Sequence, residues 1–297
     1  MIRRTCQIAA GAVLATCVSA SAQVDVLVFT KTTGFRHPSI PDGIAAVREL
    51  GEANCFGVEQ TEDGADFNPA NLARFQAVIF LCTTGDVLDD TQQAAFEAYI
   101  HAGGGFVGVH SASDTEPDWV FYNELLGTHI ADHPQIQTAT VRIEDRGNLS
   151  SADAPDPWVR TDEWYNFVSN PRPSVQVLAT VDESTYVGGT MGADHPIMWC
   201  HEFQGGRSWY TAMGHTSESY AEPAFRRSLL GGILWAAGQT AFPCAADFDC
   251  NGAANVGDIF SMLTAWFAMQ PRTDYNQTGT ADIGDIFAFL AIWFRGC

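Results

Sequence analysis

Residues 77–109 decide the fold class. They begin with an apolar run, Ala-Val-Ile-Phe-Leu-Cys at 77–82, continue with a segment of helical periodicity at 90–101, and end with a second apolar run, Gly-Phe-Val-Gly-Val at 105–109. Short apolar runs of this kind predict strands that are buried on both faces. Strand, helix and strand in succession form the unit of a parallel sheet covered by helices. We therefore predict an α/β protein.

The same alternation continues on both sides of this stretch. Residues 24–30 predict a strand and residues 43–54 a helix. Less regular strands and a closing amphipathic helix follow, at 138–144, 175–181, 197–203, 208–213 and 223–237. From residue 241 the chain changes to regularly spaced Asp, Asn, Gly and aromatic residues. We therefore predict a main domain at 23–240 and a smaller one at 241–297.

The composition is that of a globular protein, because 46% of the 297 residues are hydrophobic and 17% are charged. Acidic residues number 35 against 15 basic ones, which gives a net charge of −20. Nucleic acids are bound through basic surfaces. The charge therefore argues against nucleic acid as a partner.

Residues 1–22 have the pattern of a secretory signal peptide. Arg3 and Arg4 are followed by an apolar run at 8–18 and by Ala-Ser-Ala at 20–22, before Gln23. The apolar run is shorter than the ~20 residues that span a bilayer, and no later segment is long enough. We predict export to a periplasmic, extracellular or cell-surface location, with no membrane span after cleavage.

Polar residues follow the predicted strands. In open α/β sheets, ligands bind beyond the carboxyl ends of the strands. The wall of the site is therefore expected in the loops at residues 31–37, 83–86, 110–114 and 214–215.

His110 follows a predicted strand directly, in the sequence Gly-Gly-Gly-Phe-Val-Gly-Val-His-Ser-Ala at 103–112. Small residues on both sides are typical of a nucleophile elbow, in which a sharp turn presents one side chain above the sheet. An imidazole there suits proton transfer or metal ligation better than acyl transfer. The alternative is a hydrogen-bonded histidine at a strand end.

Separated motifs in the main domain resemble the trehalose-utilisation (ThuA-like) family of the class I glutamine amidotransferase-like superfamily. They are Lys-Thr-Thr-Gly-Phe-Arg-His at 31–37, the glycine-rich stretch ending at His110 with Asp114, Asp-Glu-Trp-Tyr at 162–165, His-Pro-Ile-Met-Trp at 195–199, and Gly206-Arg207 and Gly214-His215 with Tyr220. The resemblance covers residues 25–238 and implies a flavodoxin-like sheet with helices on both faces. It also implies that His110 replaces the amidotransferase cysteine, which excludes glutamine hydrolysis through a thiolate.

This family is associated with the catabolism of disaccharides and their keto derivatives. The resemblance therefore implies an enzyme that isomerises, cleaves or hydrolyses an oxidised (keto) sugar. The catalytic candidates are His110, Asp114, Glu163 and His215. The candidates for substrate binding are Lys31, Arg36, His37, His195 and, as an apolar face for a sugar ring, Trp164.

These residue types suit the chemistry of a keto sugar. A base must remove a proton next to the carbonyl, and a donor must stabilise the developing enolate oxygen. His110 or Glu163 could be the base, and Arg36, Lys31 or His215 the electrophile.

Two alternative functions remain open at this point. The domain could be a non-catalytic carbohydrate-binding or scaffold protein, with Glu163 an interior partner of Arg160 or Arg207 and with Trp164 in the core. It could also be a metal-assisted hydrolase. Its histidines form no closely spaced ligand pair, so a metal site would have to be assembled from distant loops. His129 and His133, four residues apart, could lie on one face of a helix or in a loop.

The C-terminal segment contains a duplicated calcium-loop pattern. Oxygen-bearing side chains occupy loop positions 1, 3, 5, 9 and 12, as calcium requires. The first set is Asp247, Asp249, Asn251, Asn255 and Asp258, and the second, 27 residues later, is Asp274, Asn276, Thr278, Asp282 and Asp285. Gly252 and Gly279 occupy position 6. We predict two Ca²⁺ sites, the second weaker because of Thr278.

Asp at position 12, with one apolar helical segment after each loop, resembles a type I dockerin. This resemblance implies a small all-α domain that needs calcium to fold and that attaches to a cohesin-like partner or scaffold. Cys244 and Cys297 bracket the repeats, so a disulfide between them is the preferred pairing, with Cys244 to Cys250 as the rival. Cys55, Cys82 and Cys200 are expected to be buried thiols.

Overall fold

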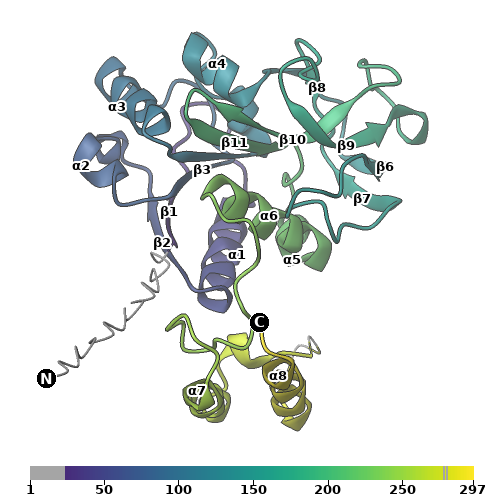
Figure 1. The fold of residues 1–297 in the computed structure, drawn as a ribbon. Helices are drawn as coiled ribbons and strands as arrows, with labels where there is room; N and C mark the ends of the chain where they lie inside the picture. Colours follow the sequence, from purple (N-terminus) through teal and green to yellow (C-terminus); the bar gives the residue numbers. More distant parts are fainter. Residues whose placement is uncertain (1–23, 277, 279) are drawn as a thin grey trace, which may run out of the picture.

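The computed structural model describes residues 24–276, 278 and 280–297. The predicted signal peptide at 1–22 lies outside the described residues. Figure 1 shows a large α/β part. The C-terminal helices lie beside it, below α1 in this view. Within the part of the chain that is described, no helix is both long and apolar enough to cross a membrane.

The large part is built on a nine-stranded sheet with the order β2-β1-β3-β4-β11-β10-β9-β6-β7. The strands are β1 Val24–Phe29, β2 Phe56–Thr61, β3 Ala77–Leu81, β4 Gly105–Val109, β6 Gln137–Ile143, β7 Trp158–Asp162, β9 Gln176–Asp182, β10 Pro196–Phe203 and β11 Gly206–Thr211. Strands β2, β1, β3, β4 and β11 run parallel, and β10, β9, β6 and β7 extend the sheet in antiparallel fashion. The predicted parallel sheet is thus one half of a mixed sheet. A separate pair consists of β5 Ile130–Asp132 and β8 Asn166–Phe167.

Helices cover both faces of the sheet, as expected. The longer ones are α1 Ile40–Ala53, α3 Asp90–His101 and α6 Pro223–Ala236, and the shorter ones are α2 Pro69–Leu72, α4 Val120–Leu126 and α5 Ser217–Ala221. In Figure 1, α1, α5 and α6 lie on one face and α2, α3 and α4 on the other. Single 3₁₀ turns occur at η1 Gly64–Asp66, η2 His110–Asp114, η3 Glu183–Thr185 and η4 Pro271–Thr273.

The apolar runs of the parallel strands form the centre of the core. Every residue of β3 and β4 is buried. Strand β2 was not predicted because it lies at the edge of the sheet, where its side chains are only partly buried and its sequence has no continuous apolar run. Helix α3 begins with a capping box of Asp89 and Gln92, which fixes its first turn after β3.

The C-terminal segment consists of α7 Val256–Phe267 and α8 Ile283–Arg295 with the loops before them. It has a buried apolar cluster of its own, made by Phe248, Met262, Ala265 and Phe289. The two halves contact each other reciprocally. The Trp266 indole donates to the carbonyl oxygen of Asp282 at 2.9 Å, and the Trp293 indole donates to that of Asn255 at 3.0 Å.

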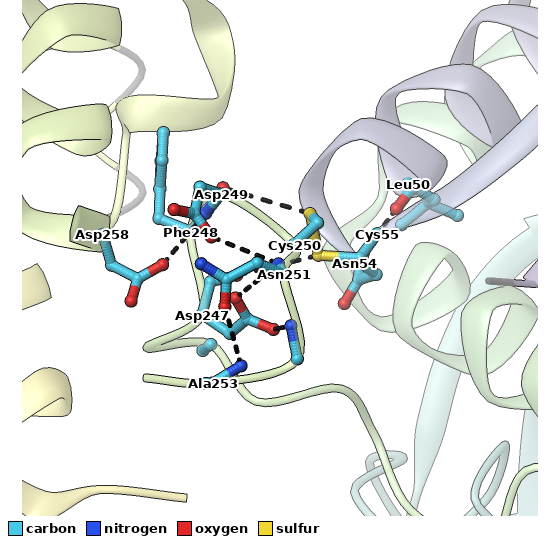
Figure 2. The surroundings of a disulfide bond; sticks show 12 residues. Leu50, Asn54, Cys55, Asp247, Phe248, Asp249, Cys250, Asn251, Ala253 and Asp258 are labelled. Atoms are coloured by element: carbon cyan, nitrogen blue, oxygen red, sulfur yellow. Dashed lines mark hydrogen bonds between the residues drawn. A yellow bond between two sulfur atoms is a disulfide. The ribbon is translucent and has the colours of Figure 1, made fainter. Parts of the chain in front are cut away.

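Within residues 24–297, as far as they are described, two disulfides are formed. Cys244 is bonded to Cys297, which confirms the preferred pairing. Cys55 is bonded to Cys250, so the expectation of a buried thiol at Cys55 is wrong. Cys55 follows the end of α1, where the chain turns out of the helix beside the first C-terminal loop (Figure 2). Cys82 and Cys200 are buried free thiols, as expected.

Candidate functional site

His110 occupies a sharp turn between β4 and η2. Its φ of 54° lies in the left-handed region, which non-glycine residues seldom adopt and which is strained. The side chain is fully buried. Its Nδ1–H donates to the carbonyl oxygen of Ala212 at 2.7 Å, so that Nε2 carries the lone pair. The turn therefore presents Nε2 of this imidazole beyond the end of β4.

Three polar groups converge on His110 Nε2. The Tyr165 hydroxyl donates to it at 2.7 Å, His215 Nδ1 lies 3.0 Å away, and Glu163 Oε2 lies 3.4 Å away. Glu163 Oε2 is also 3.0 Å from His215 Nδ1. The other carboxylate oxygen, Oε1, is 2.9 Å from His133 Nδ1. Glu163 thus pairs with histidines, and the interpretation that it is an interior partner of Arg160 or Arg207 is wrong.

Charge and burial shift the pKa values of Glu163 and His215 in opposite directions. Burial by itself would raise the pKa of Glu163, but hydrogen bonds and charges from His110 and His215 outweigh it and hold this pKa well below its usual value. Burial would lower the pKa of His215, whereas the Glu163 carboxylate raises it more strongly. The favoured pair is therefore a carboxylate and an imidazolium.

Asp162 fixes the loop that carries His215. Its buried carboxylate accepts the backbone N–H groups of Gly214 at 2.9 Å and His215 at 3.0 Å, and it forms an ion pair with Arg160 at 3.1 Å. Arg160 also lies 3.4 Å from Glu222. The end of β7 therefore contributes two carboxylates with different roles. Asp162 holds the loop that carries His215, and Glu163 belongs to the histidine cluster.

His37 completes the group from the loop after β1. Its ring lies edge-on to those of His110 and His215, with centroids 4.8 and 4.9 Å away. Ser111 Oγ is 3.3 Å from His37 Nδ1. Burial, with added charge from His110 and His215, lowers the pKa of His37 to about 3. This imidazole is neutral at physiological pH.

Other predicted site residues have different partners. The Lys31 ammonium donates to the carbonyl oxygen of Val87 at 2.6 Å, and Arg36 pairs with Glu62 at 2.6 Å. Trp164 is buried in the core and donates to the Gln137 carbonyl oxygen at 2.8 Å.

His195 and Asp114 lie outside the cluster of His37, His110, Glu163 and His215. His195 is buried, 2.8 Å from Glu183 through Nδ1 and 2.8 Å from the Tyr165 carbonyl oxygen through Nε2. Asp114 is exposed and lines a cavity of about 950 Å³ together with His129 and Ser113. Among the described residues, the lining of this cavity includes none of the four groups at His37, His110, Glu163 and His215.

Sequence reasoning missed Tyr165, His133 and Asp162 as site residues. Tyr165 and Asp162 flank Glu163 in the Asp-Glu-Trp-Tyr motif, so their position was a usable signal. His133 directly follows β5, a three-residue strand with partly exposed side chains. A strand this short and polar has no clear sequence pattern. His129 and His133 therefore flank a strand and do not lie on a helix face.

The two C-terminal loops place their predicted ligands alike. Asp247, Asp249 and Asp258 bring carboxylate oxygens within 4.8 Å of one another. Asp258 is buried and accepts the backbone N–H groups of Asp249 at 3.0 Å and Asn255 at 2.7 Å.

In the second loop, Asp285 accepts those of Asn276 at 3.0 Å and Asp282 at 2.7 Å in the same way. Asn255 and Asp282 also cap α7 and α8. Asp247 and Asp274 each accept a backbone N–H group of the loop, from Asn251 and Thr278 at 3.1 and 3.0 Å. Gly279 lies outside the described residues.

The fold is a mixed α/β fold of the flavodoxin-like kind, with His110 at the turn after β4. The family model for trehalose utilisation (ThuA) matches residues 25–236. The chain therefore belongs to the ThuA family.

Solved structures show the same fold. A ThuA-like protein from Bacteroides uniformis is similar with a TM-score of 0.62 at 20% sequence identity, over 76% of this chain and 95% of that chain. A ThuA-like protein from Parabacteroides merdae has a TM-score of 0.61 at 18% identity, over 73% of this chain and 91% of that chain. Among the curated proteins, none matches the chain.

Proposed function

We propose that this protein is an exported enzyme that transforms an oxidised (keto) sugar or disaccharide in carbohydrate catabolism. The observation that carries the proposal is the Glu163–His215 pair, held 3.0 Å apart among buried polar groups beyond the sheet. Neighbouring titratable groups whose pKa values are pushed apart are typical of an acid and a base at work. Membership of the trehalose-utilisation family supports a sugar as the substrate class.

In this proposal, substrate meets the members of the cluster that remain partly exposed. The side chains of Glu163 and His215 are 10% and 16% exposed, whereas that of His110 is fully buried. Glu163 removes the proton from the carbon next to the keto group, and His215 donates a proton to the developing enolate oxygen. The two electrons of the broken C–H bond form the new carbon–carbon double bond. The carbonyl π electrons pass to the oxygen that His215 protonates. Protonation of the former carbonyl carbon, with loss of the proton from the hydroxyl on the deprotonated carbon, completes an isomerisation.

Cleavage follows the same first step when the glycosidic oxygen is attached to the next carbon. The enol oxygen then gives up its proton and the carbonyl re-forms. The carbon–carbon double bond moves to lie between the deprotonated carbon and the next one, and the C–O bond breaks as the departing oxygen takes a proton. His110 and Tyr165 lie behind the reacting pair and position His215. The ring of His37 contacts that of His215, whereas Asp114 and His195 lie outside the cluster, and Lys31 and Arg36 are engaged by Val87 and Glu62. The electrophile in this proposal is therefore His215.

The test is an NMR-monitored incubation of the full chain with trehalose, 3-keto-trehalose and related keto-glycosides. The Glu163→Gln variant should lose turnover by about 100-fold or more, since general acid–base groups contribute on that scale. His101→Gln is the matched control, because His101 is exposed at the end of α3 and contacts Gln204. Ligand-induced shifts without turnover would instead favour the non-catalytic carbohydrate-binding protein. If the incubation shows no ligand-induced shifts and no turnover, the proposed substrate class is contradicted.

We further propose that the C-terminal repeats bind two Ca²⁺ ions and dock on a cohesin-like scaffold. Convergence of Asp247, Asp249 and Asp258 supports the first site, and the matching hydrogen bonds of Asp285 support the second. Exposed apolar side chains occur in pairs 27 residues apart, at Val256 and Ile283, Phe260 and Phe287, and Phe267 and Phe294. Such exposed apolar side chains favour a protein partner.

Calorimetric titration of the full chain with calcium tests the repeats. Two sites are expected, with the weaker one lost in Asp274→Ala and the stronger one in Asp247→Ala. The absence of heat on calcium addition, or titrations that are unchanged in both variants, would contradict the proposal.

Two disulfides support export, because such bonds persist in oxidising compartments.

A further inference from the structure

We propose that His37, His110, His215 and Glu163 form a binding site for one divalent transition metal ion such as Zn²⁺. Each of the four side chains offers one donor atom, and these atoms all lie within 4.8 Å of one another. The inference goes beyond the proposed function, because it concerns what the cluster binds and does not depend on the identity of the sugar.

The spacing of the donor atoms fits a tetrahedral ion. Donors at the usual zinc distance of about 2.0–2.1 Å, set at tetrahedral angles, lie about 3.3 Å from one another. His110 Nε2 is 3.0 Å from His215 Nδ1 and 3.4 Å from Glu163 Oε2, and the latter two atoms are 3.0 Å apart. These three atoms already form one face of such a tetrahedron.

Groups around the donors are arranged as they are around metal ligands. A ligating histidine usually donates its second ring N–H to a carbonyl, carboxylate or other polar group, which fixes the tautomer. His110 does so to the carbonyl oxygen of Ala212, and His37 Nδ1 lies 3.3 Å from Ser111 Oγ. The free oxygen of Glu163 is 2.9 Å from His133. Three of the four proposed ligands therefore have an outer partner.

The donor set also indicates the class of metal. Three imidazole nitrogens and one carboxylate favour zinc and its transition-metal neighbours, whereas calcium and magnesium prefer oxygen alone. Four ligands from the protein would leave an approach on the side of Glu163 and His215, which retain some exposure. With the ion bound, Glu163 and His215 would be ligands and not the free base and acid of the metal-free protein, and the cation would act as a Lewis acid on a sugar carbonyl or hydroxyl oxygen.

Tertiary structure explains why the sequence has no metal motif. The four residues follow four separate strands, β1, β4, β7 and β11, and span residues 37 to 215. Strands β1, β4 and β11 belong to the parallel half of the sheet, so their carboxyl ends lie at one edge. A site assembled from distant loops was one of the alternatives left open by the sequence. His129, His133, His195 and His201 are not in the group.

The test is a calorimetric titration of the full, chelator-treated chain with Zn²⁺, in excess calcium that saturates the C-terminal loops. One zinc ion per chain is expected. His37→Asn should abolish this binding or weaken it by more than 100-fold, while leaving the Glu163–His215 pair in place. His133→Gln removes an outer partner from a half-exposed position, and it should weaken binding by about 10- to 100-fold. This second variant keeps the test decisive if His37→Asn fails to fold.

His129→Gln is the matched control, because His129 is a partly buried imidazole outside the cluster. Its zinc affinity should equal that of the parent. Zinc binding that is absent, or that survives both cluster variants unchanged, would overturn the proposal. Because no substrate is present, the result is independent of whether the chain turns over keto sugars. A protein that binds zinc but transforms no sugar would contradict only the proposed function.

Discussion

The sulfur of Cys55 is bonded to that of Cys250, which lies between Asp249 and Asn251 in the first predicted calcium loop. Figure 2 shows the bond reaching from the end of α1 to this loop, with Asp247 and Asp249 beside it. A sequence separation of 195 residues makes it the longer of the two disulfide loops. The bond therefore ties the C-terminal segment to the main α/β part next to its proposed ligands.

Loss of this disulfide should lower thermal stability substantially. In the chain-entropy description, closing a loop of this length stabilises the folded state by roughly 5 kcal/mol. Cys55→Ser, Cys250→Ser and the double variant should show the same decrease in melting temperature, because each removes the same bond. A double variant much less stable than either single one would contradict this account. The calcium affinity of the first loop, measured by calorimetry, should also be lower in these variants.

Tyr165→Phe should have opposite effects on stability and on zinc binding. The hydroxyl, which burial keeps protonated by raising its pKa well above the usual value, donates to His110 Nε2 at 2.7 Å. Losing this hydrogen bond should destabilise the metal-free protein by about 1 kcal/mol. The same bond competes with a metal for the Nε2 lone pair, so zinc should bind about 5-fold tighter. Thermal melts and zinc titrations check both; weaker zinc binding would contradict the assignment of Nε2 as a ligand.

His201 should contribute to loss of stability in acid. Burial lowers its pKa from 6.5, and this outweighs the opposite effect of its hydrogen bond with the Leu125 carbonyl oxygen. Below pH 6.5 the unfolded chain therefore binds a proton that the folded chain resists, so stability falls as pH falls toward the folded pKa.

The His201→Gln variant isolates this effect. Its amide can still donate to the Leu125 carbonyl oxygen, but it does not titrate. Between pH 7.5 and 5.5, its melting temperature should therefore decrease less than that of the parent. Equal decreases in the two proteins would show that His201 does not contribute.

Trp266→Phe and Trp293→Phe should have equivalent effects on opposite repeats. Each indole donates to the carbonyl oxygen of the residue that caps the other repeat's helix. Each substitution should cost about 1 kcal/mol in stability. Trp266→Phe should weaken the second calcium site more than the first, and Trp293→Phe the reverse. Calorimetric titrations with calcium measure both sites, and Phe267→Leu, at an exposed neighbour, is the control.

Much of the fold was accessible from the sequence because burial leaves a continuous signal. Helix α3 and strand β4 begin and end where the periodicity predicts, at Asp90–His101 and Gly105–Val109. The edge strand β2 and the short strands β5 and β8 gave no such signal, since their residues are partly exposed or few. The antiparallel direction of β9 and β10 could not be predicted either. Direction depends on how the connections cross the sheet.

The candidate site was accessible only in part. His37, His110, Glu163 and His215 were identified by position and by family resemblance, and the structure brings these four together. Lys31 and Arg36 come from the same loop as His37, but their long side chains reach other partners. Where a flexible side chain ends depends on the carbonyls and carboxylates near it, and these come from distant segments.

The sequence by itself determined the apolar strands, the loops that follow them and the duplicated C-terminal pattern, because each is encoded by residues close together in the chain. Tertiary structure alone decided that Tyr165 and His133 join the histidine cluster and that Cys55 pairs with Cys250. These contacts join residues that are 30 to 195 positions apart in the chain. Their formation depends on the packing of the whole sheet, which positions each loop against the others, and no local pattern records it.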